Sequence, residues 1–374
     1  MSLDKPKRTS CLMKLAKLLA VPVNVALAVS LVFSAYGGTI DPLRTPIGAL
    51  AAMLFPLLLL VTLIATVANA LFFRRLALLN ILSVLVCWGP VVTFCPLNFF
   101  RPSVSEISES TDKVIKVMTY NVYGFLDYTH HDDMVLDGNS SLEYILETDA
   151  DIVLCQEGMS VSGIKNSTMQ QRDSLRARYP YIHVDDRGME IFSKYPFERV
   201  PLTYSNRWQY DVCLYVVDVD GVRLNLFNLH LQSIGLTPSD KELFRRITDG
   251  EAKGEMQEIR HDLISKLSEA FRNRAIQAHQ VREFVDSVTG PVLLCGDFND
   301  IPGCYAARVI AGDDMTDAYR AAALGPAITY HADRFYFRID QMMTRGGIIP
   351  LRVWREVRPS SDHYPLIGYF SLTP

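Results

Sequence analysis

The chain has 374 residues, of which 49% are hydrophobic and 21% are charged, and its formal net charge is −4. This apolar content excludes an intrinsically disordered chain, and seven cysteines spread over such a length exclude a small disulfide-stabilised fold. The charge is divided unevenly, because residues 1–100 carry a net +6 and the remaining 274 residues carry −10. We therefore expect two parts that face different surroundings.

The first hundred residues have the pattern of a membrane anchor. Three stretches without Asp, Glu, Lys or Arg cover residues 18–40, 47–73 and 76–100. Each is longer than the roughly 20 helical residues that cross the hydrocarbon core of a bilayer. A cleaved signal peptide is the alternative for the first stretch, but the long basic leader and the two further apolar stretches favour a retained segment. We predict an anchor over residues 1–101 with three transmembrane helices.

The charged residues beside these stretches predict the orientation of the anchor. Five basic residues precede the first stretch and two separate the second from the third, whereas the connection 37–46 holds only one acid and one base. Lys and Arg are enriched on the cytoplasmic side of membrane proteins, so we expect the N-terminus in the cytoplasm. Three helices then place the rest of the chain on the extracytoplasmic side, which is the periplasm in a bacterium.

The remainder is predicted to be one α/β domain. Residues 102–112 form a polar linker, and residues 113–374 are enough for one large core. Short apolar runs in this part predict buried strands over 114–120, 152–155, 190–193, 212–219, 222–230, 292–295 and 335–342.

A turn and one long helix complete this prediction. Asp220 and Gly221 separate two predicted strands, as in a hairpin turn. Ser239 and Glu242 form a capping-box pattern, and a helical apolar stripe runs over 259–285 until Gly290. This mixture predicts mixed or antiparallel sheets between helices.

Polar side chains with catalytic potential recur where the apolar runs end. A single Asp after such a run is usually a cap or a turn residue, but six such places in one domain favour a catalytic cleft. They combine carboxylate, amide and imidazole groups: Asn121, Gln156, Glu157, Asn228, His230, Asp297, Asn299, Asp300, Asp340, Asp362 and His363.

In this combination and order, the motifs resemble the endonuclease/exonuclease/phosphatase family. That superfamily includes pancreatic deoxyribonuclease, abasic-site endonucleases, neutral sphingomyelinases and inositol-polyphosphate phosphatases. The resemblance covers about residue 113 to the end of the chain. It implies a four-layer sandwich of two facing mixed β-sheets flanked by helices. It also implies hydrolysis of phosphate esters that depends on Mg²⁺ or Mn²⁺.

The residue types agree with the implied cofactor. Mg²⁺ prefers oxygen ligands and usually takes one or two carboxylates, with water and substrate phosphate in the other positions. We predict Glu157 as the principal metal ligand, with Asn121 beside it. Asp362 and Asp297 contribute to the same cation or to a second one.

The remaining polar residues are assigned catalytic roles. By the resemblance, Asn299, Asn121 and His230 donate hydrogen bonds to the phosphate oxygens, where charge gathers in the transition state. Asp297 orients or deprotonates the attacking water. His363, held by Asp340, contacts the phosphate or acts as an acid or a base.

Four other features leave alternatives open. Glu190 stands where the family often has a small residue, and it either faces outward or acidifies the cleft; Gln341 stands where an aromatic residue is common. Residues 130–133, His-His-Asp-Asp, indicate a solvated loop more than a metal site. Cys213 and Cys304 could pair in an oxidising compartment.

The substrate class follows only from charge and location. A domain with a net charge of −10 is disfavoured for duplex nucleic acid, and an anchored domain is close to lipid phosphodiesters. We rank a phosphodiesterase for a lipid headgroup or another extracytoplasmic phosphoester first. The alternatives are a membrane-tethered nuclease and a catalytically silent module that binds phosphorylated ligands. No obligate protein partner is evident.

Overall fold

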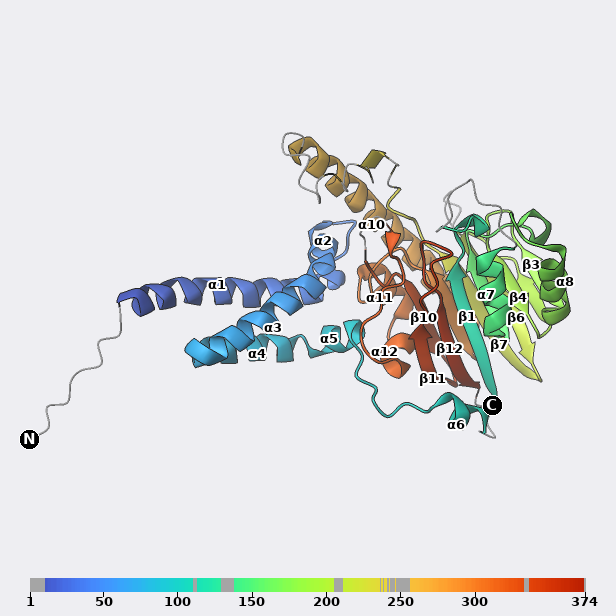
Figure 1. Cartoon of the computed structure of the whole chain (residues 1–374), viewed down its shortest axis with the longest axis horizontal. Helices are drawn as coiled ribbons and strands as arrows, with labels where there is room; N and C mark the ends of the chain where they lie inside the picture. Colours follow the sequence, from blue (N-terminus) through green and yellow to red (C-terminus); the bar gives the residue numbers. More distant parts are fainter. Residues whose placement is uncertain are drawn as a thin grey trace, which may run out of the picture. The chain divides into compact units, whose positions relative to one another are not determined.

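The chain folds into two units, Met1–Val92 and Thr93–Pro374 (Figure 1). The computed structural model describes residues 11–109, 113–128, 138–204, 211–235, 237, 239, 240, 242, 246, 256–332 and 336–372. Residues 130–133, the His-His-Asp-Asp tract, lie outside the described residues.

The first unit is built from apolar helices. They are α1 (Cys11–Tyr36), the short 3₁₀ helix η1 (Gly37–Thr39), α2 (Ile47–Met53), α3 (Phe55–Phe72), α4 (Arg74–Val86) and the beginning of α5 (Trp88–Phe94). Two helical stretches, Leu18–Thr39 and Phe55–Phe72, are long and apolar enough to cross a membrane. A third candidate exists only if α4 and α5 form one span. The predicted count of three therefore becomes two or three.

The bend between α4 and α5 explains this difference. The two helices meet at 70°, with the break at Cys87. Pro90 lacks an N–H group, so it cannot donate to the carbonyl of Val86 four residues earlier. The hydroxyl of Tyr36 donates to that carbonyl instead, at 2.7 Å. The bend therefore divides the stretch that was predicted as the third transmembrane helix into α4 and α5.

Three asparagines connect the helices of this unit. Asn24 of α1 accepts hydrogen bonds at its Oδ1 from Asn69 of α3, at 2.7 Å, and from Asn80 of α4, at 2.9 Å. All three side chains are buried. Amides that bond across apolar helices fix which faces of the helices meet.

The second unit contains two six-stranded mixed sheets. The first sheet has the order β11-β12-β1-β2-β4-β3 and the second has the order β5-β6-β7-β8-β10-β9. The β1–β2 and β7–β8 pairs are parallel, and the other pairs are antiparallel. The strands are β1 (Val114–Asn121), β2 (Ile152–Gln156), β3 (Tyr181–Val184), β4 (Glu190–Ser193), β5 (Phe197–Val200), β6 (Asp211–Val219), β7 (Val222–His230), β8 (Val292–Asp297), β9 (Thr316–Asp317), β10 (Asp340–Arg345), β11 (Ile348–Arg355) and β12 (Leu366–Leu372).

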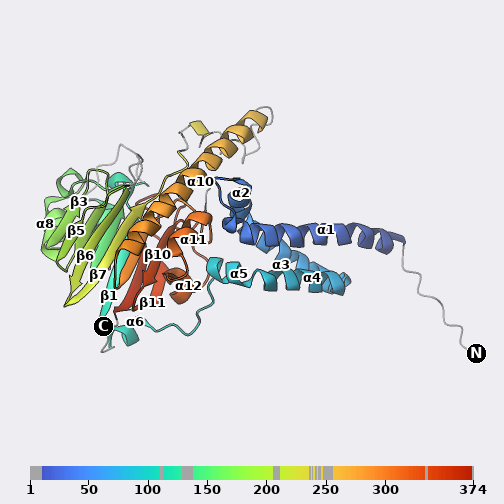
Figure 2. The ribbon, with the colours of Figure 1, turned by 180° about the vertical axis from the view of Figure 1, so that it is seen from behind.

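Helices cover the outer faces of both sheets. In Figure 1, α7 and α8 lie beside the first sheet, and Figure 2 shows α10 and α11 along the second. The helices and 3₁₀ turns of this unit are α6 (Val104–Ser108), η2 (Tyr123–Phe125), α7 (Ser140–Thr148), η3 (Val161–Gly163), α8 (Met169–Arg178), α10 (Met256–Ser287), α11 (Tyr305–Ala311) and α12 (Ala318–Ala322). The predicted four-layer sandwich is confirmed.

The apolar strands are buried on both faces. In β1, Ile115 and Val117 point into the core between the sheets, whereas Met118 and Tyr120 pack under α7 and its neighbours. Successive side chains of a strand alternate between its faces, so a central strand with cover on both sides is a continuous apolar run. This explains why the sequence located β1, β2, β4, β6, β7 and β8.

Several local predictions can be compared with the structure. The Asp220–Gly221 hairpin is confirmed, because both residues have the positive φ of a type I′ turn, 48° and 90°. The strand predicted over 335–342 begins only at Asp340, because Phe337 before it makes an isolated bridge to Tyr330 and no ladder.

Capping-box hydrogen bonds form near the predicted pair, but the long helix α10 begins only at Met256. Thr237 and Asp240 make the reciprocal hydrogen bonds, with the N–H of Asp240 on the Thr237 hydroxyl and the N–H of Thr237 on the Asp240 carboxylate. The box thus lies two residues before the predicted pair. The helix α10 ends at Ser287, shortly before Gly290 with φ +84°. Cys213 and Cys304 are both free and buried, so the suggested pairing is not formed.

Candidate active site

The strand ends of the second sheet place four polar residues in one row. Asp211 of β6 is opposite His230 of β7, His230 is opposite Asp297 of β8, and Asp297 is opposite Asp340 of β10. Residues that are opposite one another on neighbouring strands have closely spaced side chains when they share a face. The row therefore crosses four adjacent strands at one edge of the sheet.

The first sheet supplies Asn121 and Glu157. Asn121, the last residue of β1, is opposite Gln156, the last residue of β2, and Glu157 follows directly. Glu157 adopts a positive φ of 54°, and the N–H of Gly158 donates to the carbonyl of Gly188 at 2.8 Å. The left-handed turn ends the strand pairing at Glu157 and leaves its side chain 43% exposed.

Asn121 connects the two sheets. Its Nδ2 donates to Glu157 Oε1 at 3.0 Å and to Asp297 Oδ2 at 3.1 Å. Its Oδ1 accepts the backbone N–H of Tyr123 at 3.1 Å. The amide nitrogen thus faces the two carboxylates, which supports a hydrogen-bond donor at this position.

His363 and Asp340 form a buried ion pair. His363 Nδ1 lies 2.9 Å from Asp340 Oδ2, and its Nε2 lies 3.6 Å from Asp297 Oδ2. Burial alone would lower the pKa of His363, but Asp340 and Asp297 outweigh it and raise the pKa to about 10. The imidazole is therefore protonated at neutral pH, and its Nε2–H points towards Asp297.

Asp297 is a buried carboxyl group with a raised pKa. Burial and, after it, the charge of Asp340 raise the pKa of Asp297. The two histidines and the backbone N–H of Asn299 lower it, and the net pKa is about 6. That N–H donates to Asp297 Oδ1 at 2.7 Å. A carboxylate with this pKa is ionised at neutral pH and can accept a proton near it.

His230 lies between the carboxylates of the two sheets. Its Nε2 is 3.7 Å from Glu157 Oε1 and 3.7 Å from Asp297 Oδ2, and it makes no hydrogen bond within the described part of the chain. These distances are too long for direct hydrogen bonds. The nitrogen is therefore placed to contact an additional oxygen atom.

Asn299 and Asp362 lie beside this group. Asn299 has φ 51°, and its Nδ2 donates to the carbonyl of Leu231 at 2.9 Å. Asp362 is buried and contributes to the raised pKa of His363. The Ser361 hydroxyl, 2.7 Å from the carbonyl of Asn121, ties this loop to the end of β1.

The predicted site residues are thus distributed in two ways. Six are joined by contacts between their side chains: Asn121, Glu157, His230, Asp297, Asp340 and His363. The other two, Asn299 and Asp362, are held next to members of that group by the backbone and by neighbouring residues.

This donor set fits a hard divalent cation. In the described ranges, Asp297, Asp340 and His363 offer ligand atoms within 4.8 Å of one another. Protonated His363 donates a hydrogen bond and cannot ligate a metal. The remaining candidate ligand atoms are carboxylate oxygens, and they include those of Glu157, which Asn121 connects to Asp297. A cation would offset the charge of these carboxylates, and oxygen donors suit Mg²⁺ or Mn²⁺.

Three site residues escaped the sequence analysis. Asp211 begins its strand, so no apolar run precedes it, and only the pairing with His230 reveals it. The ring of Tyr330 lies edge-on to His363 with centroids 5.0 Å apart, through an isolated bridge that has no sequence pattern. Arg187 lies 3.8 Å from Asp211 and is held by Asp185 at 2.9 Å.

Glu190 does not face outward. Its side chain is fully buried, and its carboxyl carbon occupies the space beside Gly158, where a Cβ would lie 2.3 Å away. Burial raises its pKa well above the ordinary value. Burial thus favours the neutral form of this acid, which lies behind the loop that carries Glu157. Gln341 is also buried, and its Nε2 donates to the carbonyl of Asp300 at 3.2 Å.

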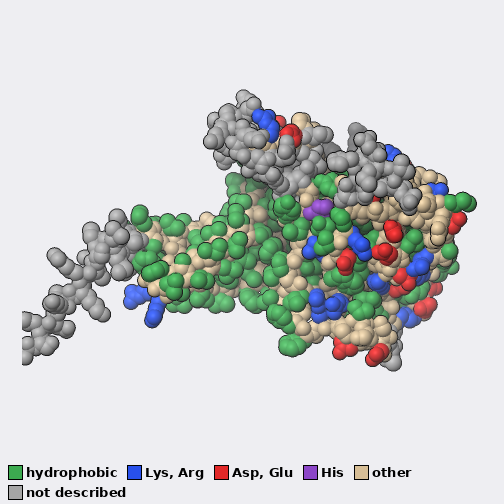
Figure 3. Space-filling view, viewed as in Figure 1, with side chains coloured by type: hydrophobic (Ala, Val, Ile, Leu, Met, Phe, Trp, Pro, Cys, Tyr) green, Lys and Arg blue, Asp and Glu red, His purple; other side chains and the backbone are tan. Residues whose placement is uncertain are grey.

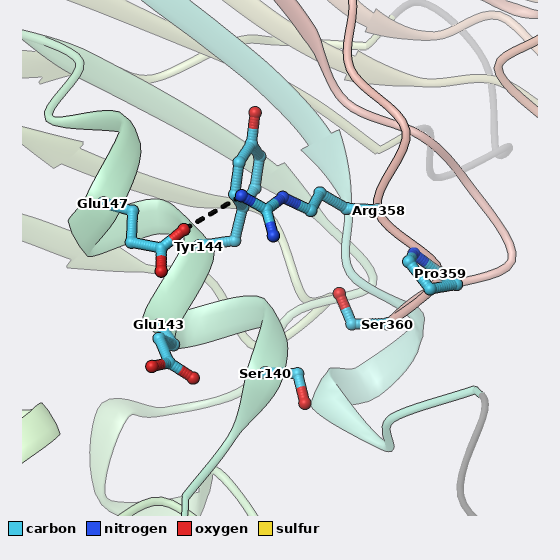
Figure 4. A pocket seen from close by; sticks show the side chains of 7 residues that line it. All are labelled: Ser140, Glu143, Tyr144, Glu147, Arg358, Pro359 and Ser360. Carbon is cyan, nitrogen blue, oxygen red and sulfur yellow. Dashed lines mark hydrogen bonds and ion pairs between the residues drawn. The ribbon is translucent and has the colours of Figure 1, made fainter.

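A separate hollow of about 200 Å³ lies next to the loop of Asp362 and His363. Figure 4 shows it between α7 and residues 358–360. Arg358 is its basic group, but it pairs with Glu147 at 3.0 Å and stacks over the Tyr144 ring at 4.5 Å. Its charge is already compensated, so this hollow is not the centre of the chemistry.

Comparisons with known proteins identify the family of the second unit. A model of the endonuclease/exonuclease/phosphatase family matches residues 118–363, and a model of a domain of unknown function matches residues 16–94. Comparison with curated proteins found no match.

Solved structures are similar at low identity. A humanized D. rerio TDP2 with 14 mutations is 14% identical, with 69% of this chain and 99% of that chain covered and a TM-score of 0.46. An endonuclease/exonuclease/phosphatase from Beutenbergia cavernae is 19% identical, with 70% and 72% covered and a TM-score of 0.45. ANGEL2, a 2′,3′-cyclic phosphatase, is 15% identical, with 70% and 96% covered and a TM-score of 0.43.

The family match begins within β1 and extends to His363, so it spans both sheets and every predicted site residue. The resemblance drawn from the strand-end motifs is confirmed. This chain belongs to the endonuclease/exonuclease/phosphatase family.

Proposed function

We propose that the protein is a membrane-anchored phosphodiesterase that depends on Mg²⁺ or Mn²⁺ and hydrolyses lipid headgroups or another extracytoplasmic phosphoester. One observation carries the proposal. Asn121 bridges the Glu157 and Asp297 carboxylates of two sheets, and the His363–Asp340 pair lies against the same Asp297. The family to which the chain belongs acts on phosphate esters.

Oxygen atoms would hold the cation, with Glu157 as the principal ligand and Asp362, Asn121 and Asp297 as the further candidates. When bound, the cation supplies positive charge that polarises a phosphate oxygen and favours ionisation of a nearby water. The Glu157 side chain is 43% exposed, so a cation bound to it would also be accessible to the substrate phosphate.

The protein's own groups bind the phosphate and manage the proton. His230 and the second N–H of the Asn299 amide donate to phosphate oxygens, and Asn121 does so after releasing one of its two carboxylates. Asp297, ionised at neutral pH, orients the attacking water and takes its proton. Protonated His363 donates from Nε2 to a phosphate or leaving-group oxygen, while Asp340 holds its ring.

The substrate is proposed from location and charge. A domain whose sequence carries −10 has no general attraction for a duplex backbone. Helices Leu18–Thr39 and Phe55–Phe72 have the length and composition of membrane spans. An enzyme retained at a bilayer meets lipid phosphodiesters at high local concentration, which supports a lipid headgroup over nucleic acid.

The test uses the full chain in detergent and in liposomes. Hydrolysis of a chromogenic phosphodiester, sphingomyelin, phosphatidylinositol and plasmid DNA is measured with Mg²⁺ or EDTA. We expect lipid turnover that EDTA abolishes and that Glu157→Gln and His363→Ala lower at least about tenfold. Glu147→Gln, whose side chain is exposed on α7, is the matched control and should keep full activity.

Each other outcome revises the proposal in a definite way. Turnover of DNA alone would replace the lipid phosphodiesterase with a tethered nuclease. Full activity in both variants would remove these residues from the mechanism. Inactivity on every substrate, together with heat released on titrating Mg²⁺ into the protein, would support a silent module that binds phosphorylated ligands.

A further inference from the structure

The segment after the last apolar helix is bound to the catalytic unit. Residues 93–100 belong to the second unit. Asn98 Nδ2 donates to the carbonyls of Arg320 and Ala323, at 2.9 and 2.8 Å, and the N–H of Gly325 donates to the carbonyl of Pro96 at 2.7 Å. An isolated bridge joins the two chain segments. The segment is thus fixed to α12 and to the loop that follows it.

These contacts leave a group of apolar side chains uncovered. Phe99 is 67% exposed and Phe100 is fully exposed. Leu97 and Leu324, which form the bridge, are 44% and 40% exposed, and Ile328 follows on the same loop at 36%. We call these five residues the apolar face. Single exposed apolar residues are common, but large apolar residues gathered on two segments that are hydrogen-bonded to each other mark an interaction surface.

Basic side chains surround the apolar face. Neither 93–105 nor 318–332 contains an acid, although the whole domain carries −10. Arg101 and Arg320 lie in these segments, and Arg352 is held nearby by donating to the Pro102 carbonyl at 3.1 Å. Of the acids that border these ranges in the sequence, Asp317 pairs with Arg338 at 3.4 Å and Glu106 accepts the N–H and hydroxyl of Ser103, both at 2.7 Å. Figure 3 shows Lys and Arg side chains gathered where α12 and β11 lie in Figure 1.

We propose that the apolar face lies on the surface of a phospholipid bilayer, with Phe99 and Phe100 between the lipid headgroups and the arginines against anionic phosphates. The proposal rests on the anchoring proposed above. Aromatic side chains with flanking basic residues are the composition that binds membrane interfaces. Phe94 ends α5 only five residues before Phe99, so the chain itself brings this face to the bilayer in which the apolar helices reside.

The same loop leads from this face to the active site. After Ile328, the Thr329 hydroxyl accepts the N–H groups of Ile339 and Asp340, at 2.9 and 3.1 Å. The next residue, Tyr330, lies edge-on to His363. Contact with the bilayer would therefore hold the substrate-side loop close to the headgroups, and so it adds a positioning surface to the proposed lipid hydrolysis.

The test is photocrosslinking of the full chain in liposomes. The variant Phe100→p-benzoylphenylalanine is irradiated in vesicles of phosphatidylcholine with and without phosphatidylglycerol, and lipid adducts are measured by mass spectrometry. Met169→p-benzoylphenylalanine, exposed on α8 at 73%, is the matched control. We expect adducts at position 100 at least about fivefold above those at position 169, with more in the anionic vesicles.

Charge and anchoring are tested separately. The double variant Arg101→Gln and Arg320→Gln should remove the increase that phosphatidylglycerol produces, while keeping the chain in the liposomes. Equal labelling at positions 100 and 169 in a chain that floats with liposomes would overturn the docking proposal and leave the anchor intact. A chain that alkaline carbonate extracts from the liposomes would overturn the anchor itself.

Discussion

At the scale of single residues, the site depends on side chains that fix the position or the protonation of their neighbours by hydrogen bonds. Asn121 keeps two carboxylates of different sheets within one amide's reach, and Asp340 keeps His363 charged. In a buried site such pairs fix both position and protonation, because an uncompensated charge there is costly. Replacing a holding residue should therefore change the chemistry of its neighbour.

Asp340→Asn tests this for the histidine. The change removes the carboxylate that raises the pKa of His363, so the pKa should fall, and the ring loses the negative charge beside its Nδ1. We expect kcat to drop by about 10²–10⁴-fold. Titration of the His363 resonance by NMR measures the pKa, and the exposed His279 is the internal reference. An unchanged His363 titration would contradict the assigned pair.

Glu190→Gln tests the buried acid. The folded protein keeps Glu190 protonated with a pKa well above 4.5, its ordinary value, whereas the unfolded chain ionises near that value. Above about pH 4.5 the folded state therefore holds more protons, and the wild-type free energy of unfolding falls by up to about 1.4 kcal/mol per pH unit from this group. The Glu190→Gln variant has no ionisable group at this position, so its free energy of unfolding does not fall with pH for this reason.

The difference in Tm between Glu190→Gln and wild type should therefore grow from pH 5 to pH 8 in favour of the variant. Glu198→Gln, at an exposed position on β5, is the control and should show no such trend. Parallel Tm profiles for Glu190→Gln and wild type over this range would show that the carboxyl group is not held neutral.

At the scale of helices and strands, prediction located the buried strands β1, β2, β4, β6, β7 and β8, but it missed β12, which lies between β11 and β1 with six of its seven residues buried. Central strands such as β7 and β8 lie between two apolar layers, and their sequences are correspondingly apolar. Edge strands lack this pattern. In β3 and β5 no residue is fully buried, β9 has two residues, and β11 shifts register between Pro350 and Arg352. These strands were missed for that reason.

The hydrogen bonds among Asn24, Asn69 and Asn80 in the first unit could not be predicted from composition. Asn24→Leu should leave the amides of Asn69 and Asn80 without their shared acceptor. We expect the free energy of unfolding in detergent to fall by about 1 kcal/mol for each hydrogen bond lost. Thr66→Ala, whose hydroxyl bonds only within its own helix, is the control. Equal stability of the Asn24 and Thr66 variants would contradict a role for the amide cluster.

At the scale of the whole molecule, the bend between α4 and α5 decides the location of the active site. If this pair is one span, the chain crosses the bilayer three times and the C-terminus lies opposite the N-terminus. If it is not, both ends lie on the cytoplasmic side. The positive residues of the leader and of Arg74 and Arg75 are cytoplasmic in both arrangements, so the number of spans alone decides the side of the C-terminus.

C-terminal fusions in a bacterial host measure this directly. We expect an alkaline phosphatase fusion to be active and a green fluorescent protein fusion to be dark, because the former folds only outside the cytoplasm. A fluorescent, phosphatase-negative pair would place the domain in the cytoplasm and would remove the extracytoplasmic substrates from the proposal.

The site was predictable to the extent that it uses strand ends. Asn121, Glu157, His230 and Asp297 each follow or end an apolar run, and the sheet brings such ends together. Asp211 was missed because only its register on β6 places it beside His230. Register and loop bridges are long-range pairings, so a reading of local patterns does not find them.

The hydrogen bonds of Pro96 and Asn98 also limit how far the enzyme can reach. Only Cys95 separates the end of α5 from the docked segment. One residue spans at most about 3.6 Å, so an anchored catalytic unit has almost no tether on which to move away from the bilayer. Its encounters would then scale with membrane area and with diffusion in two dimensions, and dilution of the surrounding solution would leave its rate on a membrane lipid unchanged.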